Sequence, residues 1–484
     1  MELLDPVLLA RFQFALCVFV HFLFVPLSIG LGLFMALAET RYYKTKDPKD
    51  RAATLFWAKI FTTTFIIGVA TGITMEFSFC TNWANYSRYV GDIFGAPLAA
   101  EALLAFFLES IFLGIVLFAR NKISPKLYLV SAWLVWFGSA LSALWILIAN
   151  SWMQTPAGYT DLGFKAEISD FWAAALNPST VARYLHTVDS VIILASFCVI
   201  AVGAYYLLRK RNMEAGKKFM KTGIIVGIIS VILMLPFAHM QATVVAEQQP
   251  AKLAAMEGQW EDGAADMTLF GWVDEEKQTT VGPAIPGFTS FLSTFDFETV
   301  FPGLNTTKNA VDFGSGAYPG VKVDSYQGGN PPVNFVFQSY HIMVAFYFLL
   351  VIWLILAGLT LKKANADKKP PSKAVLYLLV FGPIIPFICI QTGWMVAEVG
   401  RQPWVVYNLL ETANAVSPVV SGVELLITIL LFFVFYIILV TAWLRIVLGM
   451  IKKGPQVEEE AAAPMVIDIE ATEQKVAAAT EGGE

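Results

Sequence analysis

The chain has 484 residues, of which 57% are hydrophobic and only 15% are charged, and its formal net charge at pH 7 is −5. A soluble domain typically has about 45–50% apolar and about 25% charged residues, so this composition excludes an ordinary soluble protein and favours an integral membrane protein. We expect no nucleic-acid partner.

Nine apolar segments are long enough to cross a membrane as helices, since a transmembrane helix needs about 20 mostly apolar residues. They lie at 12–39, 57–80, 97–118, 127–152, 186–208, 219–239, 336–361, 374–397 and 421–447. We therefore predict an all-α, polytopic membrane protein that folds as a bundle of nine transmembrane helices. Glu2 and Asp5 replace the basic start of a signal peptide, so no cleaved signal is expected.

Basic residues cluster after every second predicted helix. The clusters lie at 41–51, 120–126, 209–221, 362–373 and 445–453, and they hold most of the 33 basic residues. Loops rich in Lys and Arg stay in the cytoplasm, so the N-terminus is predicted outside and the C-terminus inside.

Four regions follow from this pattern. Residues 1–241 hold helices one to six and residues 336–450 hold helices seven to nine. Residues 242–335 form one long extracytoplasmic loop, and loops of that length are usually functional or disordered. Its first part, 249–258, predicts a short helix behind Pro250. Residues 451–484 are acidic and rich in alanine, which predicts a disordered cytoplasmic tail.

Two histidines and a methionine fall at the outer ends of predicted helices. His21 lies in the first helix, His186 opens the fifth and Met343 opens the seventh. Haem iron accepts His alone or His with Met, which makes the three residues candidate haem ligands. A single buried His is more often a hydrogen-bonded packing residue, and a single Met more often fills space in a core. Only their shared level in the membrane favours ligation.

Two carboxylates interrupt the third apolar segment. Glu101 and Glu109 flank an apolar run, and acids inside a membrane usually serve a function such as proton transfer. The alternative is a pair of neutral, hydrogen-bonded structural carboxyls. If Glu101 and Glu109 form a proton relay, Ser142 and Asn150 on the fourth helix are expected to hydrogen-bond either to this relay or to a neighbouring helix. Glu76, Asp189 and Glu424 are further intramembrane acids without a derived role.

A second group of charges lies at the loop side. Glu398 ends the eighth helix and precedes Arg401, so it is either a metal ligand or half of a local Glu–Arg pair. Arg401 could instead bind a haem propionate, because a guanidinium fork suits a carboxylate. Lys252 and Glu257 lie on the short loop helix. They could bind a polar head group, but their spacing alone favours a solvated, charged helix face.

Several short motifs accompany these residues. They are Gly68-Val69-Ala70-Thr71-Gly72, Gly95-Ala96-Pro97-Leu98 before Glu101, Phe106-Phe107-Leu108-Glu109-Ser110, Leu141-Ser142-Ala143-Leu144-Trp145, Lys252-Leu253-Ala254-Ala255 with Glu257, and Gly400-Arg401-Gln402-Pro403-Trp404. With these motifs the chain resembles subunit I of the cytochrome bd-type quinol oxidases through all nine helices. Only about 265–332 and the tail lie outside the clear resemblance.

The resemblance implies a role for each candidate. His186 and Met343 match the axial ligands of a low-spin haem b, while His21 and Glu398 match the ligands of a high-spin haem b and a haem d, in an order that stays open. Lys252 and Glu257 match quinol-binding residues of the loop. A catalytic set of Glu101, Glu109, Ser142, Asn150 and Arg401 matches residues near the haem pair and its proton path.

The implied activity is that of a bacterial cell-membrane quinol oxidase that reduces O2 to water and generates a proton gradient. Its partners would be subunit II, often a small single-helix subunit, membrane quinol and O2. Two alternatives remain open from the sequence. A cyanide-insensitive variant would carry haem b in place of haem d, and an ion or proton transporter would use the intramembrane acids differently. The absence of paired broken helices argues against the transporter.

His341 stands where many family members carry Arg, two residues before the methionine. Histidine is charged only when protonated, with an ordinary pKa of about 6.5, so it offsets haem propionate charge less well at neutral pH. We therefore expect a lower or more pH-dependent low-spin haem potential than in relatives with Arg. A redox titration of the wild type and His341→Arg from about pH 6 to 8 checks this. Identical potentials would contradict it.

Overall fold

The computed structural model describes residues 5–308, 330–366 and 370–457. Within those ranges nine helical segments are long and apolar enough to cross a membrane, as predicted. The continuous ones are α1 (Pro6–Thr45), α2 (Pro48–Thr81), α5 (Pro125–Gln154), α7 (Thr180–Arg209), α8 (Met213–Gln248), α12 (Val333–Asn365) and α16 (Gly422–Lys453). The predicted bundle is therefore confirmed for the described part of the chain.

Two of the nine segments are interrupted, which the sequence reading missed. The third consists of α3 (Ala84–Ala100), a π-helical turn η1 (Glu101–Phe106) and α4 (Phe107–Phe118), and the eighth of α13 (Lys373–Val380) and α14 (Ile384–Val399). Pro97 and Pro383 lie just before the changes in helical pattern. Proline lacks the amide hydrogen that the helix ladder needs, so the segments predicted at 97–118 and 374–397 are present as spans but not as single continuous α-helices.

Caps and prolines set several helix starts outside the apolar runs. Asp5 accepts a hydrogen bond from the backbone of α1, Asp47 does so for α2 and Ser124 for α5, and each precedes a proline. Such residues satisfy the free amide groups of a first turn. These polar first turns explain why α2 begins at Pro48, well before the predicted residue 57.

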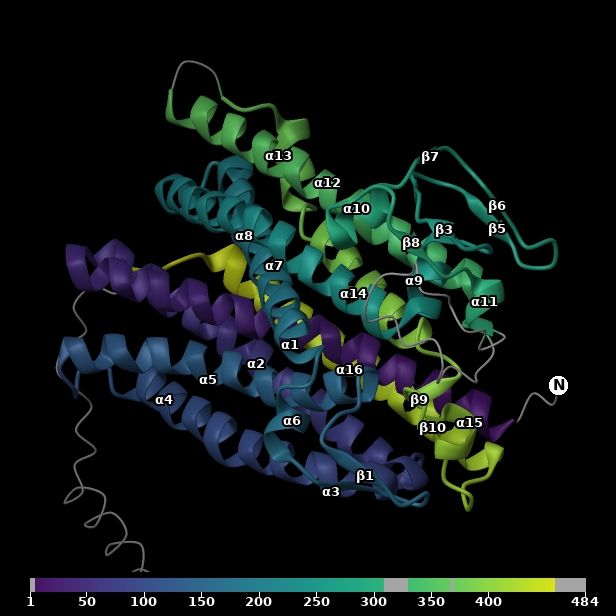
Figure 1. Cartoon of the computed structure of the whole chain (residues 1–484). Helices are drawn as coiled ribbons and strands as arrows, with labels where there is room; N and C mark the ends of the chain where they lie inside the picture. Colours follow the sequence, from purple (N-terminus) through teal and green to yellow (C-terminus); the bar gives the residue numbers. More distant parts are fainter. Residues whose placement is uncertain (1–4, 309–329, 367–369, 458–484) are drawn as a thin grey trace, which may run out of the picture.

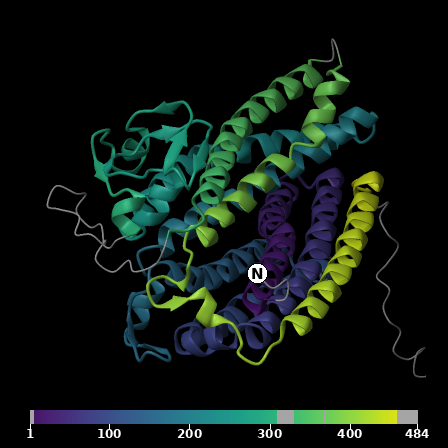
Figure 2. The same ribbon diagram turned by 90° about the vertical axis from the view of Figure 1, so that its right-hand side faces the viewer.

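Helix α1 lies at the centre of one half of the bundle. It packs against α2, α5, α7 and α16, while α7 pairs with α8, and α12 pairs with α14. Figures 1 and 2 show α3, α4 and α5 on one side of α1, and α8, α12 and α13 on its other side. Helices in lipid associate through close packing and polar contacts, so these pairings fix where polar side chains can meet.

The connections containing short strands gather at the end of the bundle where α1 begins (Figure 1). Antiparallel pairs join β1 (Tyr159–Asp161) to β2 (Ala166–Ile168), β3 (Gly263–Ala264) to β8 (Val300–Phe301), β4 (Met267–Thr268) to β7 (Ala284–Ile285), β5 (Trp272–Asp274) to β6 (Thr279–Val281) and β9 (Trp404–Val406) to β10 (Leu410–Glu411). The strands are short, and the fold remains dominated by helices. Short helices accompany them: α6 (Phe171–Ala175), α9 (Pro250–Glu257), α10 (Phe288–Thr294), α11 (Leu304–Lys308) and α15 (Thr412–Ala415).

The long loop is slightly shorter than predicted, because α8 continues to Gln248 and α12 begins at Val333. The short helix predicted behind Pro250 is present as α9. Residues 309–329 of the loop and the predicted tail from 458 onward lie outside the described residues.

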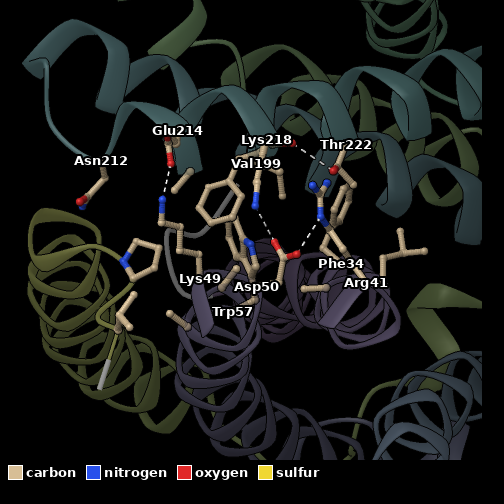
Figure 3. Close-up of a pocket in the computed structure, with 18 of the residues that line it drawn as sticks. Phe34, Arg41, Lys49, Asp50, Trp57, Val199, Asn212, Glu214, Lys218 and Thr222 are labelled. Carbon is tan, nitrogen blue, oxygen red and sulfur yellow. Dashed lines mark hydrogen bonds and ion pairs between the residues drawn. The ribbon is translucent and has the colours of Figure 1, made fainter. Parts of the chain in front are cut away.

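A pocket of about 280 Å³ lies at the opposite end of the bundle, between the α1–α2 turn and the start of α8 (Figure 3). Its charged rim is internally paired. The carboxylate of Asp50 is buried and accepts from Lys218 Nζ at 2.8 Å and from Arg41 Nε at 3.2 Å. Lys49 pairs with Glu214 at 2.7 Å on the surface. These pairs join α1, α2 and α8 at the end that carries most basic residues.

Asp50→Ala should destabilise this end of the bundle. The substitution removes the shared acceptor of two cations, which costs about 1–3 kcal/mol for a buried charge-assisted contact. Thermal unfolding of the purified protein should then begin several degrees lower. Glu214→Gln is the matched control, because its exposed pair with Lys49 contributes little. Equal unfolding temperatures for the two variants would contradict the prediction.

Candidate functional site

The carboxylate of Glu398, in the last turn of α14, lies at the centre of a polar cluster at the loop end. Its Oε1 accepts from Asn150 Nδ2 at 3.0 Å and from Gln154 Nε2 at 3.3 Å, both on α5. Its Oε2 accepts from Arg401 Nη2, so the predicted Glu–Arg pair is present. Asn150 therefore bonds a neighbouring helix instead of the Glu101 relay. The cluster holds Glu398 as an oriented carboxylate.

Lys252 of α9 reaches the same cluster from the loop. Its Nζ donates to Gln154 Oε1 at 2.6 Å and to Gln249 Oε1 at 2.5 Å. Lys252 is only 2% exposed, so the expected solvated helix face is wrong. Burial lowers the pKa of Lys252 well below its ordinary value. Nζ held this way can donate a hydrogen bond to a polar group that enters the site, as a neutral amine or as an ammonium group.

Glu257, at the other end of α9, is also buried and lies in a separate set of contacts. Its Oε1 accepts from Thr289 Oγ1 at 2.6 Å, and its Oε2 accepts from the backbone N of Thr268 at 3.3 Å. His341 Nε2 on α12 lies 3.7 Å from that Oε2. Burial raises the pKa of Glu257 to about 8. A carboxyl with this pKa can exchange protons near neutral pH.

The two acids of the third segment each have a serine partner on α5. Ser142 Oγ donates to Glu101 Oε1 at 2.6 Å, as the sequence suggested, and Ser139 Oγ donates to Glu109 Oε1. The π-helical turn begins at Glu101, so the segment between the two acids is not a regular α-helix. π-Helical turns are frequent at functional sites, because they redirect side chains out of the helical register.

His21 on α1 has a ring nitrogen engaged by α2. Its Nδ1 lies 2.9 Å from Thr71 Oγ1 of α2. A Cβ at Gly72 would lie 3.3 Å from His21 Cε1, so the small residue leaves room beside the ring. A hydrogen bond at Nδ1 typically orients a metal-binding imidazole whose Nε2 faces the metal.

His186 and Met343 lie deeper in their helices than predicted, because α7 begins at Thr180 and α12 at Val333. Within the described residues, His186 Nδ1 is buried without a hydrogen-bond partner. A Cβ at Gly393 of α14 would lie 3.1 Å from Met343 Sδ. Helix α14 packs against both α7 and α12. It therefore connects the helices that carry the two candidate ligands.

Unsatisfied cationic groups complete the site. Arg183 of α7 and Arg401 are 6% and 3% exposed, yet Nε of both and Nη1 of Arg401 have no hydrogen-bond partner among the described residues. Buried donors are normally satisfied, and a guanidinium prefers a carboxylate or phosphate. Together with the imidazole and thioether groups, this donor set fits an iron porphyrin that carries carboxylate side chains.

Sequence reasoning missed several residues of the site. Gln154, Gln249, Arg183 and Ser139 are buried polar residues that no motif singled out. Gln154 follows Asn150 by one helical turn and Arg183 precedes His186 by three residues, which is the only signal they offered. Conversely, Glu424 is exposed in the capping box of α16 and does not belong to the site.

Comparisons with known proteins show the family of the chain. Residues 9–455 match the model of the family described as cytochrome bd terminal oxidase subunit I. The chain is 37% identical to cytochrome bd ubiquinol oxidase subunit 1 of Bacillus subtilis over 96% of this chain and 97% of the relative. It is 35% identical to cytochrome bd-II ubiquinol oxidase subunit 1 of Escherichia coli over 86% of this chain and 91% of the relative. The solved bd oxidase of Geobacillus thermodenitrificans matches with a TM-score of 0.81 and 26% identity, covering 94% of this chain and 100% of that one.

Proposed function

The chain belongs to the cytochrome bd terminal oxidase subunit I family and is a haem-containing membrane subunit of a quinol oxidase, and from this premise we propose which residues carry the reaction. The matches do not favour the transporter alternative. The observation that carries the assignment is that Lys252 of the loop and Glu398 of the bundle both bond to Gln154. A quinol-binding lysine and a metal-binding carboxylate thereby belong to one site.

His186 and Met343 would hold a low-spin haem b, and His21 and Glu398 a high-spin haem b and a haem d. Support comes from the unpartnered Nδ1 of His186, and from Gly393 facing the sulfur of Met343. When bound, haem iron supplies one-electron transfer and the reduction of O2. Arg183 and Arg401 would bind the haem propionates through their free N–H groups.

Lys252 and Glu257 would bind and deprotonate the quinol. Nζ of Lys252 would donate to a quinol oxygen, because an ammonium Nζ carries three donors and has two acceptors among the described residues. Glu257 would accept a proton as its carboxylate and release it outside. Residues 242–335 would then be an extracytoplasmic quinol-binding loop, with residue 1 outside and residue 484 in the cytoplasm.

Glu101 and Glu109 would carry protons for water formation, each paired with its serine on α5. Asn150 and Arg401 would orient Glu398, which both residues touch. Protons taken from the cytoplasm and released outside would generate a gradient without a pump.

The protein would work as a complex in the bacterial cell membrane, because the relatives are named as subunit 1 of their oxidases. We propose subunit II and a small single-helix subunit as partners. Helices α12 and α16 leave most of their apolar surface uncovered in this chain. Lipid or partner helices can therefore pack there.

His186→Ala tests the haem assignment in the co-expressed complex. We expect the reduced-minus-oxidised spectrum to lose the low-spin haem b band and keep the high-spin bands, because the substitution removes one axial ligand. His239→Ala is the matched control, since His239 Nδ1 lies 2.7 Å from the carbonyl of Leu292 and outside the proposed site. Loss of no haem in His186→Ala would reject the assignment.

The wild-type spectrum decides between the remaining haem sets. A far-red chlorin band beside b-type bands would establish haem d. Haem b bands alone would support the variant oxidase, and a colourless protein would overturn the proposal.

Glu257 should give quinol oxidation a characteristic pH profile. The carboxylate is the proton acceptor, and with a pKa of about 8 it is mostly protonated at neutral pH. Tyr340, His341 and Asp266 are the titratable groups around it. We expect kcat/KM for quinol to rise about tenfold per pH unit below this pKa and to level off above it.

Glu257→Gln should lower kcat/KM and flatten this rise. Glu261→Gln, a change of an exposed acid on the same loop, should leave the profile unchanged. Steady-state rates with a soluble quinol measure both variants. A Glu257→Gln variant with the wild-type pH profile would exclude Glu257 as the proton acceptor.

A further inference from the structure

The side chain of Gln154, the last residue of α5, is fully buried between the loop and the bundle. Its Oε1 accepts from Lys252 Nζ at 2.6 Å and from Gln249 Nε2 at 3.1 Å. Its Nε2 donates to Glu398 Oε1 at 3.3 Å and to the carbonyl of Ala397 at 3.2 Å. One amide therefore contacts both the quinol-binding lysine and the proposed iron ligand.

The chemistry of the neighbours fixes the orientation of this amide. Lysine can only donate and a carboxylate can only accept, so reversing the amide would place donor against donor and acceptor against acceptor. The backbone adds a further restraint, because the carbonyl of Gln154 accepts from Gln249 Nε2 at 3.0 Å. The amide is thus held in one arrangement, with its oxygen toward the loop and its nitrogen toward Glu398.

The side-chain amide of Gln154 also lies between Lys252 and Glu398 and prevents a direct ion pair between them. The stem of Lys252 passes close to the helix end that carries Glu398, since a Cβ at Gly400 would lie 2.9 Å from Lys252 Cγ. Without an intervening neutral group, the ammonium and the carboxylate would attract each other. A carboxylate drawn toward Lys252 would be a weaker partner for a metal.

We propose that Gln154 is a positioning residue that couples the quinol site to the high-spin haem site, by bonding Lys252 through its oxygen and orienting Glu398 through its nitrogen. This inference rests on the proposed roles of Lys252 and Glu398. It predicts that a change at Gln154 alters quinol binding and haem properties together.

Gln154→Met in the assembled complex tests the coupling, because methionine matches glutamine in size but lacks both polar groups. We expect KM for quinol to rise about tenfold, since a buried ammonium loses an acceptor. We expect the midpoint potential of the high-spin haem ligated by Glu398 to fall, because a carboxylate that loses a donor is more basic and stabilises ferric iron. Haem content should stay at the wild-type level.

Two controls separate coupling from local damage. Gln249→Met also removes an acceptor of Lys252 but leaves the donor to Glu398, so only KM should rise. Thr155→Val changes the next buried residue, which bonds Asn177 and Ser179 and no member of the cluster, so neither quantity should move. Gln154→Glu keeps an acceptor for Lys252 and removes the donor to Glu398. It should leave KM within about twofold of wild type and lower the potential, even if the methionine variant fails to assemble.

A change of KM without a change of potential in Gln154→Met, or of neither, would overturn the inference. Failure of the proposed function has a different signature. Lys252→Met would then leave the quinol KM unchanged, or Glu398→Gln would leave every haem potential unchanged.

Discussion

The partly buried carboxylate of Glu398 is the constraint around which the loop end of this protein is arranged. A charge at this depth needs partners, and here they come from α5 and from the turn after α14. Asn150 and Gln154 face Glu398 from successive turns of α5, which requires α5 and the end of α14 to approach at this level. Because Gln154 also accepts from Lys252, the same contact fixes α9 against the bundle.

The long loop is organised around Glu257, a buried acid of the site. Glu257 receives hydrogen bonds from Thr289 at the start of α10 and from the backbone of Thr268 in β4, and it faces His341 on α12. Three segments that are far apart in the sequence therefore converge on one carboxyl. The short strand pairs bring these segments into reach, which explains why a loop with little regular structure can still bury a titratable group.

The number of membrane helices followed from apolar length, and the pair of Glu398 with Arg401 followed from their spacing of three residues. The contact of Asn150 with Glu398 could not be predicted, because 248 positions separate the residues and only the packing of α5 on the end of α14 joins them. The burial of Lys252 was misjudged for the same reason, since its two glutamine acceptors include one from α5. The π-helical turn at Glu101 follows Pro97 and packs against α5, a tertiary contact that hydropathy does not report, so apolar length predicted the span but not its interruption.

The two ends of the bundle differ in how their buried cations are paired. At the end with the pocket, the buried acid Asp50 is paired with Arg41 and Lys218, so the local charges are satisfied by the protein itself. At the loop end, the buried residues Arg183, Lys252 and Arg401 surround the single carboxylate Glu398, and several guanidinium N–H groups have no partner in the described chain. Burying such an excess of positive charge is unfavourable unless an anionic group offsets it. The carboxylates of a haem would supply such an anionic group, so the charges at this end suit the kind of cofactor that the family implies.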